Sequence, residues 1–159
     1  MYLLSRGSGY PVLFIHGIPT SSQLWSGIID KLLGRFTCMA VDLPGLGRTP
    51  KDRCSVTQLQ TLADQIEKIR VEHNIDKWHV VGHDAGSAIA VHYAHRFQEH
   101  VGRLALLSPA VFPGAEAFSS LPDHPAASPW RVTCTRGERH FLEHRNAIRH
   151  GTTTSRGTD

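Results

Sequence analysis

The stretch VVGHDAGSAIA, residues Val80–Ala90, decides how this sequence folds. The apolar residues at its start are typical of a buried strand, and the small and apolar residues at its end predict a helix. The letters GHDAG between them form a turn with Asp84 at its centre. A turn this tight leaves no room for side chains two positions on either side, which explains Gly82 and Gly86.

Asp84 is therefore predicted at the N-terminus of a helix. Free backbone N–H groups and the helix dipole stabilise a carboxylate there, so we expect Asp84 to be ionised at neutral pH. One interpretation is a helix N-cap aspartate with no chemical role. The other is a nucleophile, because glycine-x-nucleophile-x-glycine between a strand and a helix is the pattern of a nucleophile elbow. Asp84 alone does not decide between them.

Residues 1–114 alternate between short apolar runs and helical patterns. The runs predict strands buried on both faces: Tyr2–Leu4, Val12–Ile15, Phe36–Val41, Trp78–Val81 and Leu104–Leu107. The helices are predicted around residues 24–33, around residues 59–69, and from about Gly86 to Phe97. This alternation predicts an α/β fold, a mostly parallel sheet flanked by helices and truncated at its C-terminal side.

Two further predictions concern strand pairing at the edges of that sheet. The letters SRGSGYP read as a turn, so the first two strands are expected to pair as an antiparallel hairpin. Leu104–Leu107 is expected to be an unpaired apolar edge strand, which would favour aggregation.

The composition changes after Gly114. From residue 115 to residue 159, 13 of 45 residues are hydrophobic, against 51 of the preceding 114, so the strand–helix rhythm is lost. We therefore divide the chain into an N-terminal half of an α/β core, 1–114, and an atypical tail, 115–159. Three interpretations of the tail remain open: the start of a second, helical cap subdomain, a disordered segment, or a frame-shifted reading of the gene.

The composition also limits which partners this protein is expected to bind. Lys and Arg are scattered singly, which argues against a surface for nucleic acid or membrane. Three cysteines without a CxxC pair indicate a reducing compartment, so a cytoplasmic protein is expected, with Cys38 as a core residue. His79 and His83 are four apart but separated by strand-to-turn geometry, so no metal is expected, and no cofactor either.

A second motif, FIHGIP, follows the second predicted strand. Ligands of α/β sheets bind at the carboxyl edge of the strands, where this loop lies. The backbone N–H groups of Ile18 and Ala85 are candidates for an oxyanion hole. Gly17 and Pro19 are expected to shape the loop, and His16 to orient it.

A third motif, DLPGLGRT at residues 42–49, follows the next strand to the same edge. Its glycines do not fit the dinucleotide fingerprint, so we interpret it as architecture. Arg48 is a minor candidate for facing the site. His83, next to Asp84, is expected to pack locally and shape the site.

The order of these three motifs resembles the N-terminal half of the α/β-hydrolase fold, over residues 2–114. Aspartate in the elbow resembles the epoxide hydrolase and haloalkane dehalogenase branch. The resemblance implies that Asp84 attacks a carbon of a small apolar substrate, an epoxide or alkyl halide, and forms an ester. A histidine then activates water, while the N–H groups of Ile18 and Ala85 stabilise the oxyanion.

The sequence departs from that branch in several places. Ile18 and Ala85 replace the asparagine and tryptophan that hold the halide in dehalogenases. The tyrosines that assist epoxide opening come from the cap, whereas those of this chain all precede it: Tyr2, Tyr10 and Tyr93. Ser108 stands where some relatives carry an acid. His140, in RHFLEH, is the one candidate for the base.

Two functions follow from this pattern. The first is a hydrolase that acts through an aspartyl ester, incomplete in this chain and without turnover. The alternative is a non-catalytic remnant or binding module of the same fold.

Overall fold

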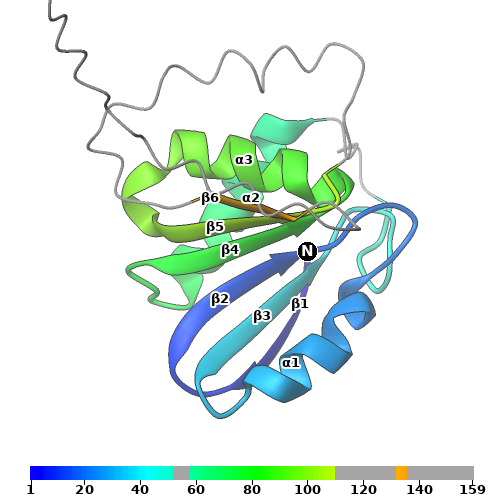
Figure 1. The fold of residues 1–159 in the computed structure, drawn as a ribbon. Helices are drawn as coiled ribbons and strands as arrows, with labels where there is room; N and C mark the ends of the chain where they lie inside the picture. Colours follow the sequence, from blue (N-terminus) through cyan, green and yellow to red (C-terminus); the bar gives the residue numbers. More distant parts are fainter. Residues whose placement is uncertain (52–57, 110–131, 136–159) are drawn as a thin grey trace, which may run out of the picture.

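A computed structural model describes residues 1–51 and 58–109 and the backbone of residues 132–135. These residues form a six-stranded sheet in the order β1-β3-β2-β4-β5-β6, with helices on both faces (Figure 1). The strands are β1 (Tyr2–Gly7), β2 (Tyr10–Ile15), β3 (Phe36–Asp42), β4 (Trp78–His83), β5 (Val101–Leu107) and β6 (Val132–Thr135). The helices are α1 (Ser26–Leu32), α2 (Leu59–Glu72) and α3 (Ala85–Arg96), with short 3-10 turns η1 (Ser22–Trp25) and η2 (Gln98–His100).

The predicted α/β architecture is confirmed. Strands β2 to β6 run parallel to their neighbours in the sheet, and β1 alone runs antiparallel, beside β3. The carboxyl ends of β2, β3 and β4 consequently meet at one edge of the sheet. Within the described part of the chain, no helix has the length and apolar character needed to cross a membrane.

The predicted hairpin between the first two strands is wrong. β3 lies between β1 and β2 and is hydrogen-bonded to both, from Tyr2↔Asp42 on one side and Tyr10↔Phe36 on the other. The turn still reverses the chain, and Thr37 Oγ1 of β3 donates a 3.0 Å hydrogen bond to the Gly9 carbonyl. A turn motif indicates that the chain reverses, but not which strand fills the neighbouring position.

The prediction that Leu104–Leu107 is an unpaired edge is also wrong. These residues of β5 pair in parallel with Val132–Thr135, so β6 forms the edge of the described sheet. The four letters VTCT are too few to show a strand period, and they lie in the segment whose apolar content falls. The division at residue 114 stays a prediction, because most of 115–159 lies outside the described residues.

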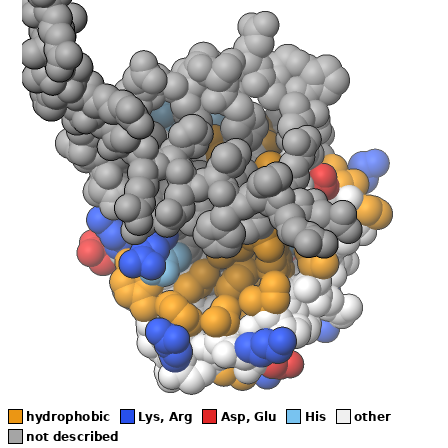
Figure 2. Space-filling view, in the orientation of Figure 1, with side chains coloured by type: hydrophobic (Ala, Val, Ile, Leu, Met, Phe, Trp, Pro, Cys, Tyr) orange, Lys and Arg blue, Asp and Glu red, His pale blue; other side chains and the backbone are white. Residues whose placement is uncertain are grey.

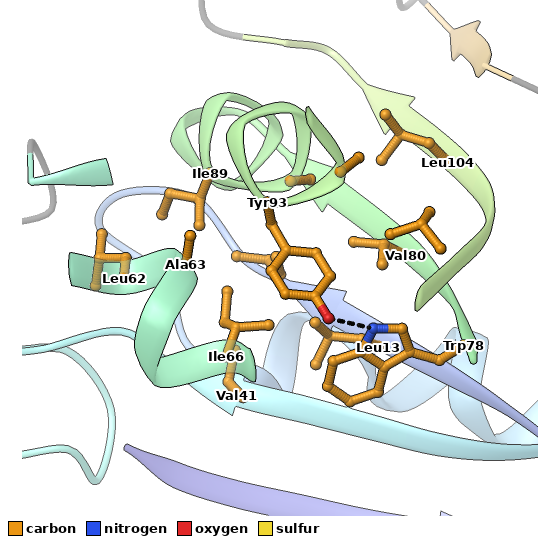
Figure 3. Close-up of a cluster of buried hydrophobic side chains, with 14 of the residues drawn as sticks. Leu13, Val41, Leu62, Ala63, Ile66, Trp78, Val80, Ile89, Tyr93 and Leu104 are labelled. Atoms are coloured by element: carbon orange, nitrogen blue, oxygen red, sulfur yellow. Dashed lines mark hydrogen bonds between the residues drawn. The ribbon is translucent and has the colours of Figure 1, made fainter. Parts of the chain in front are cut away.

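The larger core lies between the sheet and the helices α2 and α3. Figure 3 shows the buried side chains of this cluster, with Tyr93 of α3 and Ile66 of α2 directed toward the strands. The Trp78 Nε1–H donates to the Tyr93 hydroxyl at 3.2 Å, and that hydroxyl donates to Glu67 Oε2 at 2.8 Å. These two bonds satisfy the polar atoms of two large buried rings and join β4 to both helices.

The opposite face of the sheet is only partly covered. α1 and η1 bury Trp25 and Ile29 against β2 and β3, and Cys38 is fully buried there, as predicted. Along β4 and β5, by contrast, buried side chains facing α3 alternate with half-buried ones on the α1 side. A groove of about 380 Å³ lies on that side, and hydrophobic side chains gather beside α1 in Figure 2.

Candidate active site

Asp84 occupies the junction between β4 and α3. Its backbone has φ 52° and ψ −123°, a left-handed conformation that an aspartate rarely adopts. Its N–H donates to the Leu107 carbonyl of β5 at 3.2 Å, and its carbonyl accepts from the Ser87 N–H at 3.0 Å. These bonds hold the strained residue between the sheet and the first turn of the helix.

The glycines around Asp84 are required by close packing, as the sequence predicts. A Cβ atom on Gly82 would lie 2.6 Å from the Gly86 carbonyl oxygen. A Cβ atom on Gly86 would lie 2.3 Å from the Ile15 carbonyl oxygen and 2.5 Å from that of His16. All three distances are shorter than carbon–oxygen contacts permit. Gly82 therefore lets α3 begin close to β4, and Gly86 lets α3 approach the end of β2.

The Asp84 carboxylate does not cap its own helix. Although Asp84 stands at the N-cap position of α3, its side chain makes no capping hydrogen bond. Its Oδ2 instead accepts a 3.0 Å hydrogen bond from the Ile18 N–H, from a loop 66 residues away in sequence. The carboxylate therefore faces the loop after β2, which disfavours the N-cap interpretation.

Gly17 permits this approach between the two loops. A Cβ atom there would lie 2.4 Å from the Cβ of Asp84 and 2.5 Å from Oδ2. The N–H of Ala85 belongs to the first residue of α3, where a helix leaves N–H groups without an intrahelical partner. Ile18 thus approaches the carboxylate from the loop after β2, whereas Ala85 follows Asp84 directly in the chain, and Ile18 is 47% exposed.

His16 connects the loop after β2 to the loop after β3. The Leu43 N–H donates to its Nε2 at 3.0 Å, so the ring proton lies on Nδ1, which donates to the Gly17 carbonyl at 2.7 Å. Burial lowers the pKa of His16, outweighing the hydrogen bond to Gly17 and the nearby Asp42 carboxylate. The fully buried ring is thus neutral and holds a single tautomer.

Asp42 organises the loop after β3. Its Oδ1 accepts from the Ser22 N–H at 2.6 Å and its Oδ2 from the Arg48 N–H at 2.8 Å. Burial opposes ionisation, but these donated hydrogen bonds hold the pKa of Asp42 below its ordinary value. The Arg48 guanidinium donates to the Tyr2 hydroxyl at 2.6 Å.

Of the other residues named from the sequence, the structure describes His83, Pro19 and Ser108. The His83 ring lies edge-on to Trp25, with centroids 6.3 Å apart, and its Nδ1 has no hydrogen-bond partner among the described residues. Pro19 follows Ile18 through a cis peptide bond and lines a surface hollow. Ser108 directly follows β5 and has φ 41°. His140 lies outside the described residues.

No group of three His, Cys, Asp or Glu side chains in residues 1–51 and 58–109 is arranged to hold a metal ion. The hydrogen bond that the described residues make to the Asp84 carboxylate comes from a backbone N–H, that of Ile18, a donor that suits a carboxylate or a developing oxyanion. It holds Oδ2, and among the described residues no donor binds Oδ1.

Two residues that support the site were not singled out from the sequence. Thr20 binds the Gly17 carbonyl twice, through its hydroxyl at 2.8 Å and its N–H at 3.1 Å. Asp42 was interpreted only as part of a rigid loop. A threonine three residues after a glycine is the pattern of a local side-chain turn, and it was the available signal for Thr20.

Comparison with known proteins agrees with this fold. The model of the alpha/beta hydrolase fold family matches residues 10–132. The chain belongs to this family. A soluble epoxide hydrolase from a Corynebacterium species is 32% identical over 120 residues, which cover 74% of this chain and 42% of that protein.

Solved structures show the same fold over a similar part of this chain. An epoxide hydrolase without ligand superposes with a TM-score of 0.65 and 31% identity, over 74% of this chain and 44% of that one. An ancestral haloalkane dehalogenase superposes with a TM-score of 0.62 and 29% identity, over 68% and 38%. This α/β-hydrolase chain therefore spans less than half the length of these relatives.

Proposed function

We propose that this chain carries the nucleophile half of a hydrolase that acts through an ester of Asp84 on a small apolar epoxide or alkyl halide. One observation carries the proposal: the Ile18 N–H binds Oδ2 of Asp84 at 3.0 Å while the carboxylate leaves its own helix uncapped. A carboxylate held by one oxygen presents the other oxygen to a substrate in a defined direction.

The proposed chemistry has two steps. In the first, Oδ1 attacks a carbon of the substrate; either an epoxide carbon–oxygen bond breaks and its oxygen takes a proton from solvent, or a halide ion leaves. In the second, water adds to the carbonyl carbon of the Asp84 ester, and the diol or alcohol departs as the carboxylate re-forms. The N–H groups of Ile18 and Ala85 would stabilise the oxyanion of this second step.

The second step needs a base that removes a proton from water. His16 is unsuited, because both of its ring nitrogens are already occupied by backbone groups and its pKa is lowered by burial. The one candidate from the sequence, His140, remains a prediction. We therefore expect this chain to form the ester and to release product slowly or not at all.

Intact-mass spectrometry tests the proposal. The chain is incubated with a panel of small epoxides and primary alkyl halides, and the modified peptide is located by fragmentation. One adduct per chain on Asp84 is expected, absent in Asp84→Asn and unchanged in Asp76→Asn, which removes an exposed carboxylate. Alkylation spread over several carboxylates would refute the assignment of Asp84.

The alternative function is a non-catalytic remnant or binding module of the same fold. It predicts that no adduct forms with any member of the panel. Steady product release would exclude the remnant and would also contradict the expected lack of turnover.

A further inference from the structure

The Gly17–Ile18 peptide unit is held from its carbonyl side by three donors. The Gly17 oxygen accepts from His16 Nδ1–H at 2.7 Å, from the Thr20 hydroxyl at 2.8 Å and from the Thr20 N–H at 3.1 Å. A carbonyl oxygen offers two lone pairs, so these donors saturate it.

The opposite side of the same peptide unit carries the Ile18 N–H, which binds Asp84 Oδ2 at 3.0 Å. The peptide is planar, so a carbonyl fixed in direction fixes the N–H in the opposite direction. Rotation of this unit would break all three bonds to the Gly17 oxygen and turn a carbonyl dipole toward the Asp84 carboxylate. Each lost bond lowers the ratio of the competent to the rotated orientation by roughly fivefold.

We propose that His16 and Thr20 are positioning residues that fix the Gly17–Ile18 peptide so that its N–H is presented to Asp84. Neither side chain touches the reacting carboxylate. Both act through the Gly17 carbonyl, and Thr20 Oγ1 also lies 3.4 Å from His16 Nδ1, so the two side chains form one cluster.

His16 and Thr20, together with the Gly17 carbonyl that both bind, are called the clamp below. The clamp is anchored at the end of β3 rather than in its own loop. His16 Nε2 accepts from the Leu43 N–H at 3.0 Å, and Leu43 directly follows β3. A protonated His16 ring would carry a second proton, on Nε2. Two N–H donors, that of Nε2 and that of Leu43, would then face each other. The clamp thus requires neutral His16, which burial favours, with Asp42 and His83 as the nearby titratable groups.

This inference rests on the role proposed for the Ile18 N–H, but the orientation of the peptide is measurable without any reaction. In ¹⁵N-labelled protein, Asp84→Asn removes the charged acceptor and should move the Ile18 amide proton resonance upfield. The same substitution is then made in Thr20→Val, which removes the hydroxyl while keeping a side chain of similar size, and in Thr20→Ser, which keeps the hydroxyl.

The expected result is that Asp84→Asn moves the Ile18 resonance by the full amount in the natural and Thr20→Ser backgrounds and by a measurably smaller amount in Thr20→Val. A purely structural role for Thr20 would leave this response unchanged. Thr20→Ala serves as the second variant if Thr20→Val does not fold. Equal responses in all backgrounds, or no response of Ile18 to Asp84→Asn, would overturn the proposal.

A second readout separates this proposal from the proposed function. If the Asp84 adduct forms, its hydrolysis by hydroxide at alkaline pH should be slower in Thr20→Val than in Thr20→Ser, by up to the roughly fivefold that one lost hydrogen bond of the clamp is worth. If no adduct forms, the proposed function fails, whereas the amide response still decides whether the clamp exists.

Discussion

Replacing Gly86 by alanine tests the contact that brings α3 to the active-site edge of the sheet. The new Cβ atom would lie 2.3 Å from the Ile15 carbonyl oxygen and 2.5 Å from that of His16. A comfortable carbon–oxygen contact is about 3.3 Å, so the helix must retreat from β2 by about 1 Å. Both oxygens belong to the backbone and cannot rotate away.

The expected cost follows from two opposing effects. Overpacking of this kind costs about 1–3 kcal/mol, and here the overlap with rigid backbone favours the upper value. Alanine inside a helix contributes about 1 kcal/mol relative to glycine. Gly86→Ala should therefore lower the free energy of unfolding by about 2 kcal/mol.

Gly27 in α1 provides the matched control. A Cβ atom there would meet nothing within 4 Å, so Gly27→Ala gains helix propensity without a clash. We expect it to raise the free energy of unfolding by about 0.5–1 kcal/mol. The same chemical change should thus have opposite signs at two helical positions.

Urea unfolding followed by tryptophan fluorescence measures both variants, since Trp25 and Trp78 are buried. With a denaturant dependence of about 2 kcal/mol per molar, the midpoints of the two variants should differ by roughly 1.5 M. A Gly86→Ala variant as stable as the natural chain would show that α3 does not approach β2 as closely as described.

Two further predictions use the same unfolding assay. Stability should fall as the pH drops from 7 to 5, because burial lowers the pKa values of His16, His79 and His92, so the unfolded chain takes up protons first; a constant midpoint would contradict this. Tyr93→Phe should lower the free energy of unfolding by about 1–3 kcal/mol, because Trp78 Nε1 and Glu67 lose the hydroxyl that both bind. Tyr10→Phe, which removes a hydroxyl from a side chain that is 41% exposed, should change the midpoint little, and equal losses would refute the role of the Tyr93 hydroxyl.

Much of the fold could be predicted because its signals are local. Each of the five apolar runs of the first 114 residues became a strand, lengthened by one to three residues, and α3 begins one residue from its predicted start. The requirement for Gly82 likewise reports a local clash, with the Gly86 carbonyl, whereas the clash at Gly86 is with the distant end of β2. The strand β6 was missed because four residues in a polar segment carry no period.

Pairing and site geometry could not be predicted, because they depend on residues distant in sequence. The insertion of β3 between β1 and β2 is decided by which strand best satisfies two open edges, and the turn SRGSGYP carries no such information. Thr20 could not be identified from the sequence for a similar reason. Its hydroxyl binds the Gly17 carbonyl, and this contact matters because the N–H at the other end of the same peptide binds Asp84.

The sequence by itself determined the α/β order of elements and an aspartate at a glycine-flanked turn between a strand and a helix, since these follow from periodicity and local steric limits. Only the tertiary structure decided what that aspartate faces. Its carboxylate turns from its own helix to the Ile18 N–H because Gly17 lets the two loops approach and because His16, bound to Leu43, holds the donor in place. Contacts between loops that are distant in sequence therefore turn a common local motif into a candidate active site.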